Sequence, residues 1–325
     1  MKKIKLLLLT ILLLSLFPII VYAGEIILVP KEEEEILGEA TFNILGTNPK
    51  IINDEFETLL SWPALPVEYQ SADFSIKYPK NKVEFISCEL NPEMYTNRNV
   101  PEESEYGYID CCIVDFNEFK SGDLKFKFKI LDAGNIQIIA EIENLYYSYI
   151  NDETVNNYGN DTKEININIP FKSDKINIIE KNSKKYIVGI DEKTTLGELT
   201  SIVSSDYTCL RYIDEDVCII DKNEETLCAT GNEIIIAKHV EENIYTNVDA
   251  YTIIIYGDTN GDGKINSGDA LAIIKNKTNT IPFKSDEFKE AGRVQEKDRG
   301  TDAVPSAIDA LMIIKHKLGK YKIVQ

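Results

Sequence analysis

The residues best suited to chemistry lie near the carboxyl end, at Asp258–Asp269, which reads DTNGDGKINSGD. Side-chain oxygens fall at the first, third, fifth, ninth and twelfth positions, and the sixth position is glycine. These donors are Asp258, Asn260, Asp262, Asn266 and Asp269. A hard divalent cation such as Ca²⁺ takes six to eight oxygen ligands, and a short loop can surround it only if the chain turns sharply at the sixth residue. The pattern therefore predicts a calcium-binding loop.

Neighbouring positions support this interpretation. Gly263 has no Cβ and can make the sharp turn, and the carbonyl of Lys264 is placed to be the seventh-position ligand. Ile265 is expected to point inward, and Asp269 stands where a carboxylate suits a helix N-terminus. The general loop pattern has Glu at the twelfth position, so the shorter Asp269 is a departure. The alternative is a polar turn without metal, but the register of the donors with Gly263 favours the metal.

The loop and the segment after it are repeated. The sequence DALAIIKNK at Asp269–Lys277 recurs as DALMIIKHK at Asp309–Lys317, forty residues later. The same offset aligns two further pairs of aspartates, Asp258 with Asp298 and Asp262 with Asp302. An internal repeat of this kind is a strong signal of fold. The duplicated loop–helix unit resembles the dockerin type I family, in which Asp at the twelfth position is typical.

The second loop, DRGTDAVPSAID at Asp298–Asp309, is a degraded copy. Gly300 replaces a donor, Ala303 replaces the turn glycine, Pro305 replaces an aliphatic residue and Ser306 is a weaker donor. The carboxylates that stay in register are Asp298, Asp302 and Asp309. We therefore expect weak calcium binding or none at the second loop.

The resemblance to dockerins implies a partner. Dockerins bind cohesins through their two duplicated helices, with contacts at the tenth and eleventh loop positions and further along each helix. The matching positions are Ser267, Gly268, Lys275 and Asn276 in the first copy and Ala307, Ile308, Lys315 and His316 in the second. For Lys275 and Lys315 an ordinary solvated helix face is an equally good interpretation. Calcium would fold the module by removing the repulsion between loop carboxylates. The connector Thr278–Lys297 is longer than expected between dockerin halves and leaves the placement of the two helices open.

The region 24–172 has the alternating pattern of antiparallel strands. Apolar residues alternate with lysines over Leu124–Ile130, and isoleucines alternate with asparagines over Ile165–Ile169. Turn signals separate such runs, so the region predicts an all-β sandwich. The order of ADFSIKYPKNKVEFISCEL at Ala72–Leu90 and GDLKFKFKILDAGNIQIIAEI at Gly122–Ile142 resembles cohesins and the related carbohydrate-binding modules. The Tyr78-Pro79 pair lacks the aspartate that this family has between them.

The region 173–254 predicts a small α+β module that resembles the spacers preceding dockerins. A helix is expected after Thr195, because Leu196, Leu199 and Ile202 have helical spacing and Glu198 can complete a capping box. Short strands are expected around it, including 186–190, 208–213, 217–220, 233–237 and 251–256. No chemistry can be assigned to this module.

The first 23 residues are typical of a secretory signal peptide. Lys2, Lys3 and Lys5 precede the apolar run Leu6–Ile20, and Val21-Tyr22-Ala23 provides a small-x-small cleavage site. An uncleaved membrane anchor is the alternative, but the run is short and contains Pro18. The sequence therefore predicts an extracellular protein that is secreted or held at the cell surface, with no membrane segment after cleavage.

Charge and cysteine usage narrow the possible partners. The formal charge of −19 would become −22 without the signal lysines. So acidic a surface repels phosphate backbones, and nucleic acid is therefore not an expected partner.

Cysteines occur at 88, 111, 112, 209, 218 and 228, with no CxxC spacing. Export permits disulfides, but free buried thiols are the favoured interpretation. The side chains of Cys111 and Cys112 should point to opposite faces of a strand.

The sequence contains no recognisable catalytic motif. The two histidines, His239 and His316, have no Ser or Cys partner in a nucleophile setting. Paired carboxylates could run glycoside hydrolysis, so a hydrolase is the least favoured alternative. Trp62, or Tyr146 and Tyr147 with Tyr149, could form an aromatic platform for sugars, although packing explains them better.

Taken together, the sequence predicts a multidomain, non-catalytic, secreted adaptor. Its expected parts are a signal peptide (1–23), a cohesin-like β-sandwich (24–172), an α+β spacer (173–254) and an α-helical dockerin with duplicated calcium loops (255–325). The expected cofactor is Ca²⁺. The expected partner is a cohesin-type domain, its own sandwich or another copy included, within a polysaccharide-degrading or surface assembly. The alternative is a carbohydrate-binding sandwich that the dockerin anchors.

Overall fold

The computed structural model describes residues 19–22, 25–28, 39–62, 67–90, 92–113, 123–149, 154–214, 217–219, 225–241 and 244–325. The chain divides into one compact unit of residues 1–39 with 63–66 and a second of residues 40–62 with 67–325. In the first unit, strands β1 (Ile19–Tyr22) and β2 (Glu25–Leu28) pair antiparallel. The rest of the predicted signal peptide lies outside the described residues. In the described part of the chain, none of the helices combines the length and the apolar character that crossing a membrane requires.

The amino-terminal part of the second unit is a sandwich of two antiparallel sheets. One sheet has the order β3 (Thr41–Leu45), β4 (Glu55–Ser61), β9 (Asp123–Ile130) and β6 (Val83–Cys88). The other has the order β11 (Asn156–Asn157), β10 (Gly134–Tyr149), β5 (Val67–Pro79), β8 (Tyr106–Ile113) and β7 (Tyr95–Asn97), and β12 (Asp161–Ile169) also pairs with β10. One hydrophobic cluster joins the inner faces of both sheets.

The alternation in the sequence produces this core. Along β9 the side chains of Leu124, Phe126, Phe128 and Ile130 are buried, while the lysines between them are partly exposed. Phe126 meets Phe74 of the opposite sheet edge-on, with ring centroids 6.2 Å apart. The predicted β-sandwich is therefore confirmed. On β8, Cys111 is buried and its neighbour Cys112 is exposed, as expected for adjacent strand residues.

The next part is a six-stranded sheet with one short helix. Its strand order is β13 (Asn177–Lys181), β14 (Lys184–Val188), β18 (Ile244–Ile253), β17 (Glu233–Glu241), β15 (Thr208–Asp214) and β16 (Val217–Ile219), with β14 and β18 parallel. Helix α2 (Leu196–Ser201) has the predicted capping box, in which Thr195 and Glu198 bond each other's backbone amides. Strand β18 begins earlier than predicted, because register shifts in the β17–β18 hairpin interrupt the alternation there.

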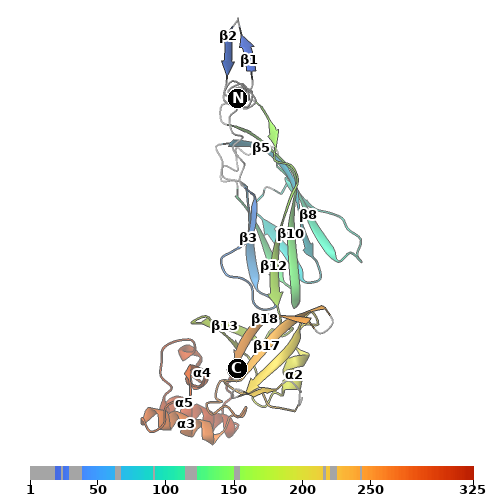
Figure 1. Cartoon of the computed structure of the whole chain (residues 1–325). Coiled ribbons are helices and arrows are strands. Elements are labelled where there is room, and N and C mark those ends of the chain that lie inside the picture. Colours follow the sequence, from blue (N-terminus) through green and yellow to red (C-terminus); the bar gives the residue numbers. More distant parts are fainter. Residues whose placement is uncertain are drawn as a thin grey trace, which may run out of the picture. The chain divides into compact units, whose positions relative to one another are not determined.

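The carboxyl-terminal part is helical (Figure 1). It contains α3 (Ser267–Lys277), α4 (Asp286–Ala291), the 3₁₀ turn η2 (Glu296–Asp298) and α5 (Ala307–Lys317). The repeated sequence forms α3 and α5, which pack against each other. Both begin with the same capping box, built by Asn266 with Asp269 in α3 and by Ser306 with Asp309 in α5. The long connector between them is not a loose loop, because it contains α4.

One hydrophobic cluster runs through the spacer sheet and the helical part. It includes Ile187 and Ile253 from the sheet, and Ile265, Ile273 and Ile313 from the loop–helix repeats. All five side chains are almost completely shielded from solvent. The two segments therefore bury one another's apolar surface, and we expect them to fold as one cooperative unit. The predicted segment boundaries stay predictions.

Candidate metal centre

The first loop turns at a residue that must be glycine. Gly263 has φ +73°, in the left-handed region that side chains with a Cβ disfavour. A Cβ added there would also lie 2.5 Å from the carbonyl oxygen of Cys228, which belongs to the spacer. The turn at the sixth position thus brings the loop into close backbone contact with the spacer.

The first-position carboxylate, Asp258, is completely buried and organises the loop around itself. Its Oδ1 accepts hydrogen bonds from the amides of Gly261 and Asp262, at 2.8 and 3.1 Å. Its Oδ2 accepts hydrogen bonds from the amides of Thr230 and Gly263, at 2.9 and 3.1 Å. The donor Thr230 belongs to the spacer, so the carboxylate is held from both segments.

The twelfth-position carboxylate, Asp269, is also completely buried. Its Oδ1 accepts hydrogen bonds from the amides of Thr259 and Asn260, at 2.9 and 3.1 Å. Its Oδ2 accepts a hydrogen bond from the amide of Asn266 at 2.8 Å, which caps α3. Asp269 therefore connects the start of the loop to the start of the helix.

Burial makes these two carboxylates electrostatically costly. Desolvation raises the pKa of Asp269 to about 7, and the nearby charge of Asp258 adds to the rise. Desolvation also raises the pKa of Asp258, although four backbone amides oppose it. Among the ion pairs of the described residues, neither carboxylate has a Lys, Arg or His partner. Two buried anions without a protein cation fit a site that a bound cation would complete.

The other predicted ligands lie at the rim of the loop. Asp262 is exposed, and its Oδ1 accepts a hydrogen bond from the amide of Lys264 at 3.0 Å. Its Oδ2 lies 3.3 Å from Nδ2 of Asn260. The side-chain oxygen of Asn266 accepts a hydrogen bond from the amide of Gly268 and thereby caps α3. Over the residues that the structure describes, no group of three His, Cys, Asp or Glu side chains has the spacing of a metal site. The ligand set of the first loop therefore stays a prediction.

The second loop keeps the helix cap but not the rest of the arrangement. Asp309 is buried, and its carboxylate accepts hydrogen bonds from the amides of Gln295 and Ser306, at 3.2 and 2.8 Å. Asp302 projects into solvent 3.9 Å from Nζ of Lys181. The proposed ligand Asp298 begins the loop but is only partly buried. The weak second site stays a prediction too.

Two arginines that sequence reasoning missed stabilise this second loop. Arg293 is buried, pairs with Glu290, and its Nε donates to the carbonyl of Ala303 at 2.6 Å. Arg299 lies over the ring of Tyr256 at 3.7 Å and donates to the carbonyl of Val324 at 2.6 Å. Arg299 directly precedes Gly300, where a ligand was lost, and that proximity could have identified it, whereas Arg293 lies seven positions before Gly300 and has no such signal.

The predicted docking residues differ in accessibility. Ser267, Ala307, Ile308 and Lys315 are exposed, whereas Gly268, Lys275, Asn276 and His316 are partly buried. His316 is held inside the molecule: its Nδ1 accepts the amide of Ile323 at 3.1 Å, and its Nε2 lies 3.3 Å from Oε1 of Glu192. Sequence reasoning missed the exposed apolar side chains of the two helices and their ends, which are Leu271, Ile274, Leu311 and Leu318.

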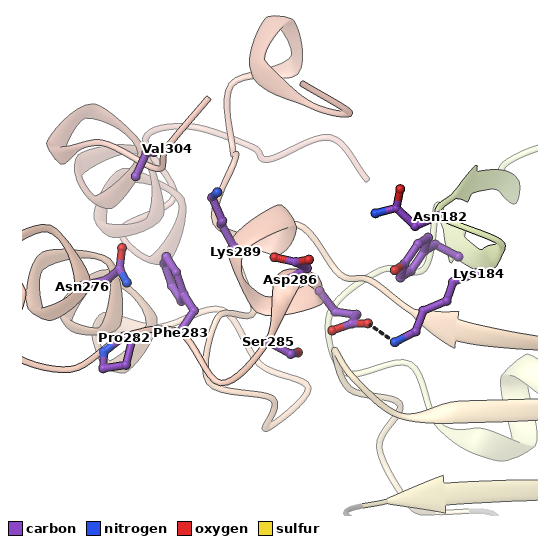
Figure 2. A pocket seen from close by; sticks show the side chains of 11 residues that line it. Asn182, Lys184, Asn276, Pro282, Phe283, Ser285, Asp286, Lys289 and Val304 are labelled. Carbon is purple, nitrogen blue, oxygen red and sulfur yellow. Dashed lines mark hydrogen bonds and ion pairs between the residues drawn. The ribbon is translucent and has the colours of Figure 1, made fainter. Parts of the chain in front are cut away.

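A cleft of about 670 Å³ lies between the β13–β14 hairpin and the connector (Figure 2). Lys184 of the hairpin and Glu287 of α4 form an ion pair with 3.2 Å between Nζ and Oε1. Figure 2 shows Lys289 and Asp286 on the connector side and Asn182 on the hairpin side. The connector therefore joins the helical part to the spacer by charge as well as by apolar packing.

The proposed aromatic platform does not include Trp62. Its side chain is buried and packs edge-on against Phe74, with ring centroids 5.5 Å apart. Tyr146 and Tyr147 are partly buried on β10. The side chains of Tyr149 and His239 lie outside the described residues. The packing interpretation of Trp62 is confirmed.

Comparison with solved structures finds small β-sandwich modules at low identity. A cohesin module of a Clostridium perfringens family 33 glycoside hydrolase is 12% identical, with 40% of this chain and 97% of that chain covered and a TM-score of 0.27. A chain of a type I cohesin–dockerin complex from Clostridium thermocellum is 12% identical, with 42% and 99% covered and a TM-score of 0.24. A collagen-binding domain of a Staphylococcus aureus adhesin is 8% identical, with 40% and 96% covered and a TM-score of 0.25.

The helical part has a family match. No curated protein matches the sequence. The family model described as the dockerin type I domain matches residues 256–316, which contain both loops, α3, α4 and most of α5. The match starts two residues before Asp258 and therefore includes the candidate metal centre. Residues 256–316 form a dockerin type I domain.

Proposed function

We propose that this chain is a secreted, non-catalytic adaptor whose dockerin binds one calcium ion and attaches to a cohesin-type module of another protein. The observation that carries the proposal is the pair of buried carboxylates, Asp258 and Asp269, which have no cationic side chain beside them in the described structure and stand inside the dockerin match. A calcium ion supplies the compensating charge.

The first loop would hold the ion with oxygens only. Its donors are the side chains of Asp258, Asn260, Asp262, Asn266 and Asp269 and the carbonyl of Lys264, a set that suits a hard cation. The backbone amides that already bond Asp258 and Asp269 fix the two buried carboxylates before the ion arrives.

The docking surface would be the exposed side of the two repeated helices. Leu271 on α3 and Leu311 on α5 occupy equivalent places in the repeat, and each exposes about half of its surface. Ile308 at the start of α5 is exposed as well. Exposed apolar side chains gathered on two adjacent helices are typical of a protein-binding surface. A protein partner is therefore favoured over a sugar for this surface.

Two measurements test the proposal. Calorimetric titration of the full chain should show one Ca²⁺ bound, and immobilised cohesin modules should capture the chain with calcium but not with chelator. Leu271→Asp and Leu311→Asp should weaken capture and leave the calcium titration unchanged. A chain that takes up no calcium, or that cohesins never capture, contradicts the proposal.

The same preparation can test the other expectations. Self-association in gel filtration would indicate that the sandwich of one copy accepts the dockerin of another. Retention on cellulose or xylan would favour the carbohydrate-binding alternative, and release of reducing sugar would favour hydrolysis. Culture medium that contains the chain without its first residues would support export.

A further inference from the structure

We propose that the spacer is part of the calcium site, and that Glu192 and Thr230 are positioning residues that set the calcium affinity of the dockerin. The proposal rests on the proposed calcium function of the first loop. It assigns a role to the segment 173–254, which contains no motif that indicates one. The spacer makes four contacts with the loop.

The first contact is made by the carboxylate of Glu192. Its Oε2 accepts the amide hydrogen of Ile265, the eighth loop residue, at 3.0 Å. Its Oε1 lies 3.3 Å from Nε2 of His316 on α5. Because Nδ1 of His316 accepts the amide of Ile323, the ring hydrogen is on Nε2 and points to Glu192. One spacer carboxylate thus connects the first loop to the second docking helix.

The second copy has no equivalent of the hydrogen bond between Glu192 and the amide of Ile265. Its eighth residue is Pro305, which has no amide hydrogen and is buried against Gly292. The second loop therefore has no amide hydrogen to donate at this position, and the contact of Glu192 with Ile265 has no counterpart there. Hydrogen bonds from Ile265 and His316 lower the pKa of Glu192 although burial opposes this, so the acceptor is ionised at neutral pH.

The other contacts hold the loop at its first and sixth positions. The amide of Thr230 donates to Oδ2 of Asp258 at 2.9 Å, and the amide of Lys193 donates to the carbonyl of Gly263 at 2.8 Å. Gly263 also lies against the carbonyl of Cys228, where no Cβ fits. The spacer therefore fixes the direction of the first ligand and the tightest turn of the loop.

Positioning of this kind changes metal affinity. Groups that orient metal ligands without touching the metal are worth about 10- to 100-fold in affinity when removed. The shared apolar cluster and the Lys184–Glu287 ion pair (Figure 2) keep the spacer in place beside the loop. We therefore expect the isolated segment 255–325 to bind calcium more weakly than the whole chain.

The test compares two spacer glutamates in the full chain. Glu192→Ala should weaken calcium binding about ten-fold in calorimetry. Glu192→Gln keeps an oxygen for Ile265 and should recover most of that loss. Glu198→Ala is the matched control: it removes the capping box of α2, which should lower the melting temperature, but Glu198 has no contact with the loop among the described hydrogen bonds. Its calcium affinity should equal that of the wild type.

Hydrogen exchange provides a second readout. In the calcium-loaded protein, peptides that contain Ile265 should lose protection in Glu192→Ala and keep it in Glu198→Ala. A calcium affinity of Glu192→Ala within two-fold of wild type overturns the proposal, and so does an equal loss in both variants. A wild-type chain that takes up no calcium overturns the proposed function itself, and that outcome is visible before any variant is compared.

Discussion

The two loop–helix repeats of the dockerin differ in the contacts that hold their loops in place. In the first, Asp258 and Asp269 are buried without a side-chain cation beside them in the described structure. In the second, Asp309 is buried in the same way, and beside the loop the buried Glu290 of α4 is paired with Arg293, whose guanidinium also bonds the carbonyl of Ala303 at the sixth loop position. The helix caps after both loops are the same.

The comparison shows that a duplicated sequence need not duplicate the contacts around its loops. A fixed guanidinium can order a degraded loop at any calcium concentration, because the cation belongs to the chain. Under the proposed function, we expect the first loop to respond to calcium and the second loop to stay ordered without it.

Among the substitutions, Arg293→Ala is expected to have the largest effect, a loss of unfolding free energy. Removing one partner of a buried ion pair leaves Glu290 unpaired and typically costs about 3–5 kcal/mol of unfolding free energy. The Ala303 carbonyl loses its donor as well. Urea denaturation should show this loss with and without calcium.

The control for Arg293→Ala is Arg98→Ala, which breaks an exposed pair with Asp110 in the sandwich and should cost less than about 1 kcal/mol. If calcium restores the stability of Arg293→Ala to that of the wild type, the second loop binds the ion after all. The division between a calcium-dependent and a calcium-independent repeat would then be wrong.

The next-largest effect is on calcium affinity, and it distinguishes the two loops through substitutions at their fifth positions, Asp262 and Asp302. Asp262→Ala should lower calcium affinity by about 100-fold, or about 2.7 kcal/mol, because it removes a proposed ligand from the first loop. Asp302→Ala should change the affinity by less than two-fold, because Asp302 projects into solvent. Both aspartates are exposed, so metal-free stability should be unchanged in each variant. Equal losses of calcium affinity would reverse the ranking of the two loops.

Much of this could be predicted from the sequence. The donor spacing of the first loop, the repeat and the helix caps are local patterns, and local hydrogen bonding decides them. The Thr195–Glu198 capping box and the alternating core of β9 were predictable for the same reason. These features depend on residues within a few positions of one another.

The missed features depend on contacts between distant segments. Glu192 meets Ile265, 73 positions away, and nothing in the residues around Glu192 indicates that contact. His316 fits the docking pattern by position, yet the tertiary fold turns it toward Glu192. Strand β18 starts at Ile244 and not at the predicted residue 251, because bulges in the β17–β18 pair interrupt the alternation of apolar and polar residues.

A third prediction compares one glycine of positive φ from each loop, Gly263 and Gly300. Gly263→Ala should be the more harmful substitution, because a Cβ would meet the Cys228 carbonyl in addition to the backbone strain of roughly 1–2 kcal/mol. Gly300→Ala should cost only the strain, since a Cβ there meets nothing within 4 Å. Thermal unfolding measures both. Equal melting temperatures would mean that the first loop is not pressed against the spacer.

The last prediction concerns the pH dependence of stability and of calcium affinity. Because the folded-state pKa of Asp269 is raised to about 7, the metal-free folded chain holds a proton there that the unfolded chain releases near pH 4. The stability contributed by this proton is present at low pH and is lost as the pH rises to about 7. Calcium has to displace the proton, so its affinity should fall about ten-fold per pH unit below about 7. Calorimetry in buffers of different ionisation enthalpy should detect the released proton, and Asp269→Asn should abolish that release. A calcium affinity that is constant between about pH 5 and about pH 8 would show that Asp269 is ionised before the ion binds.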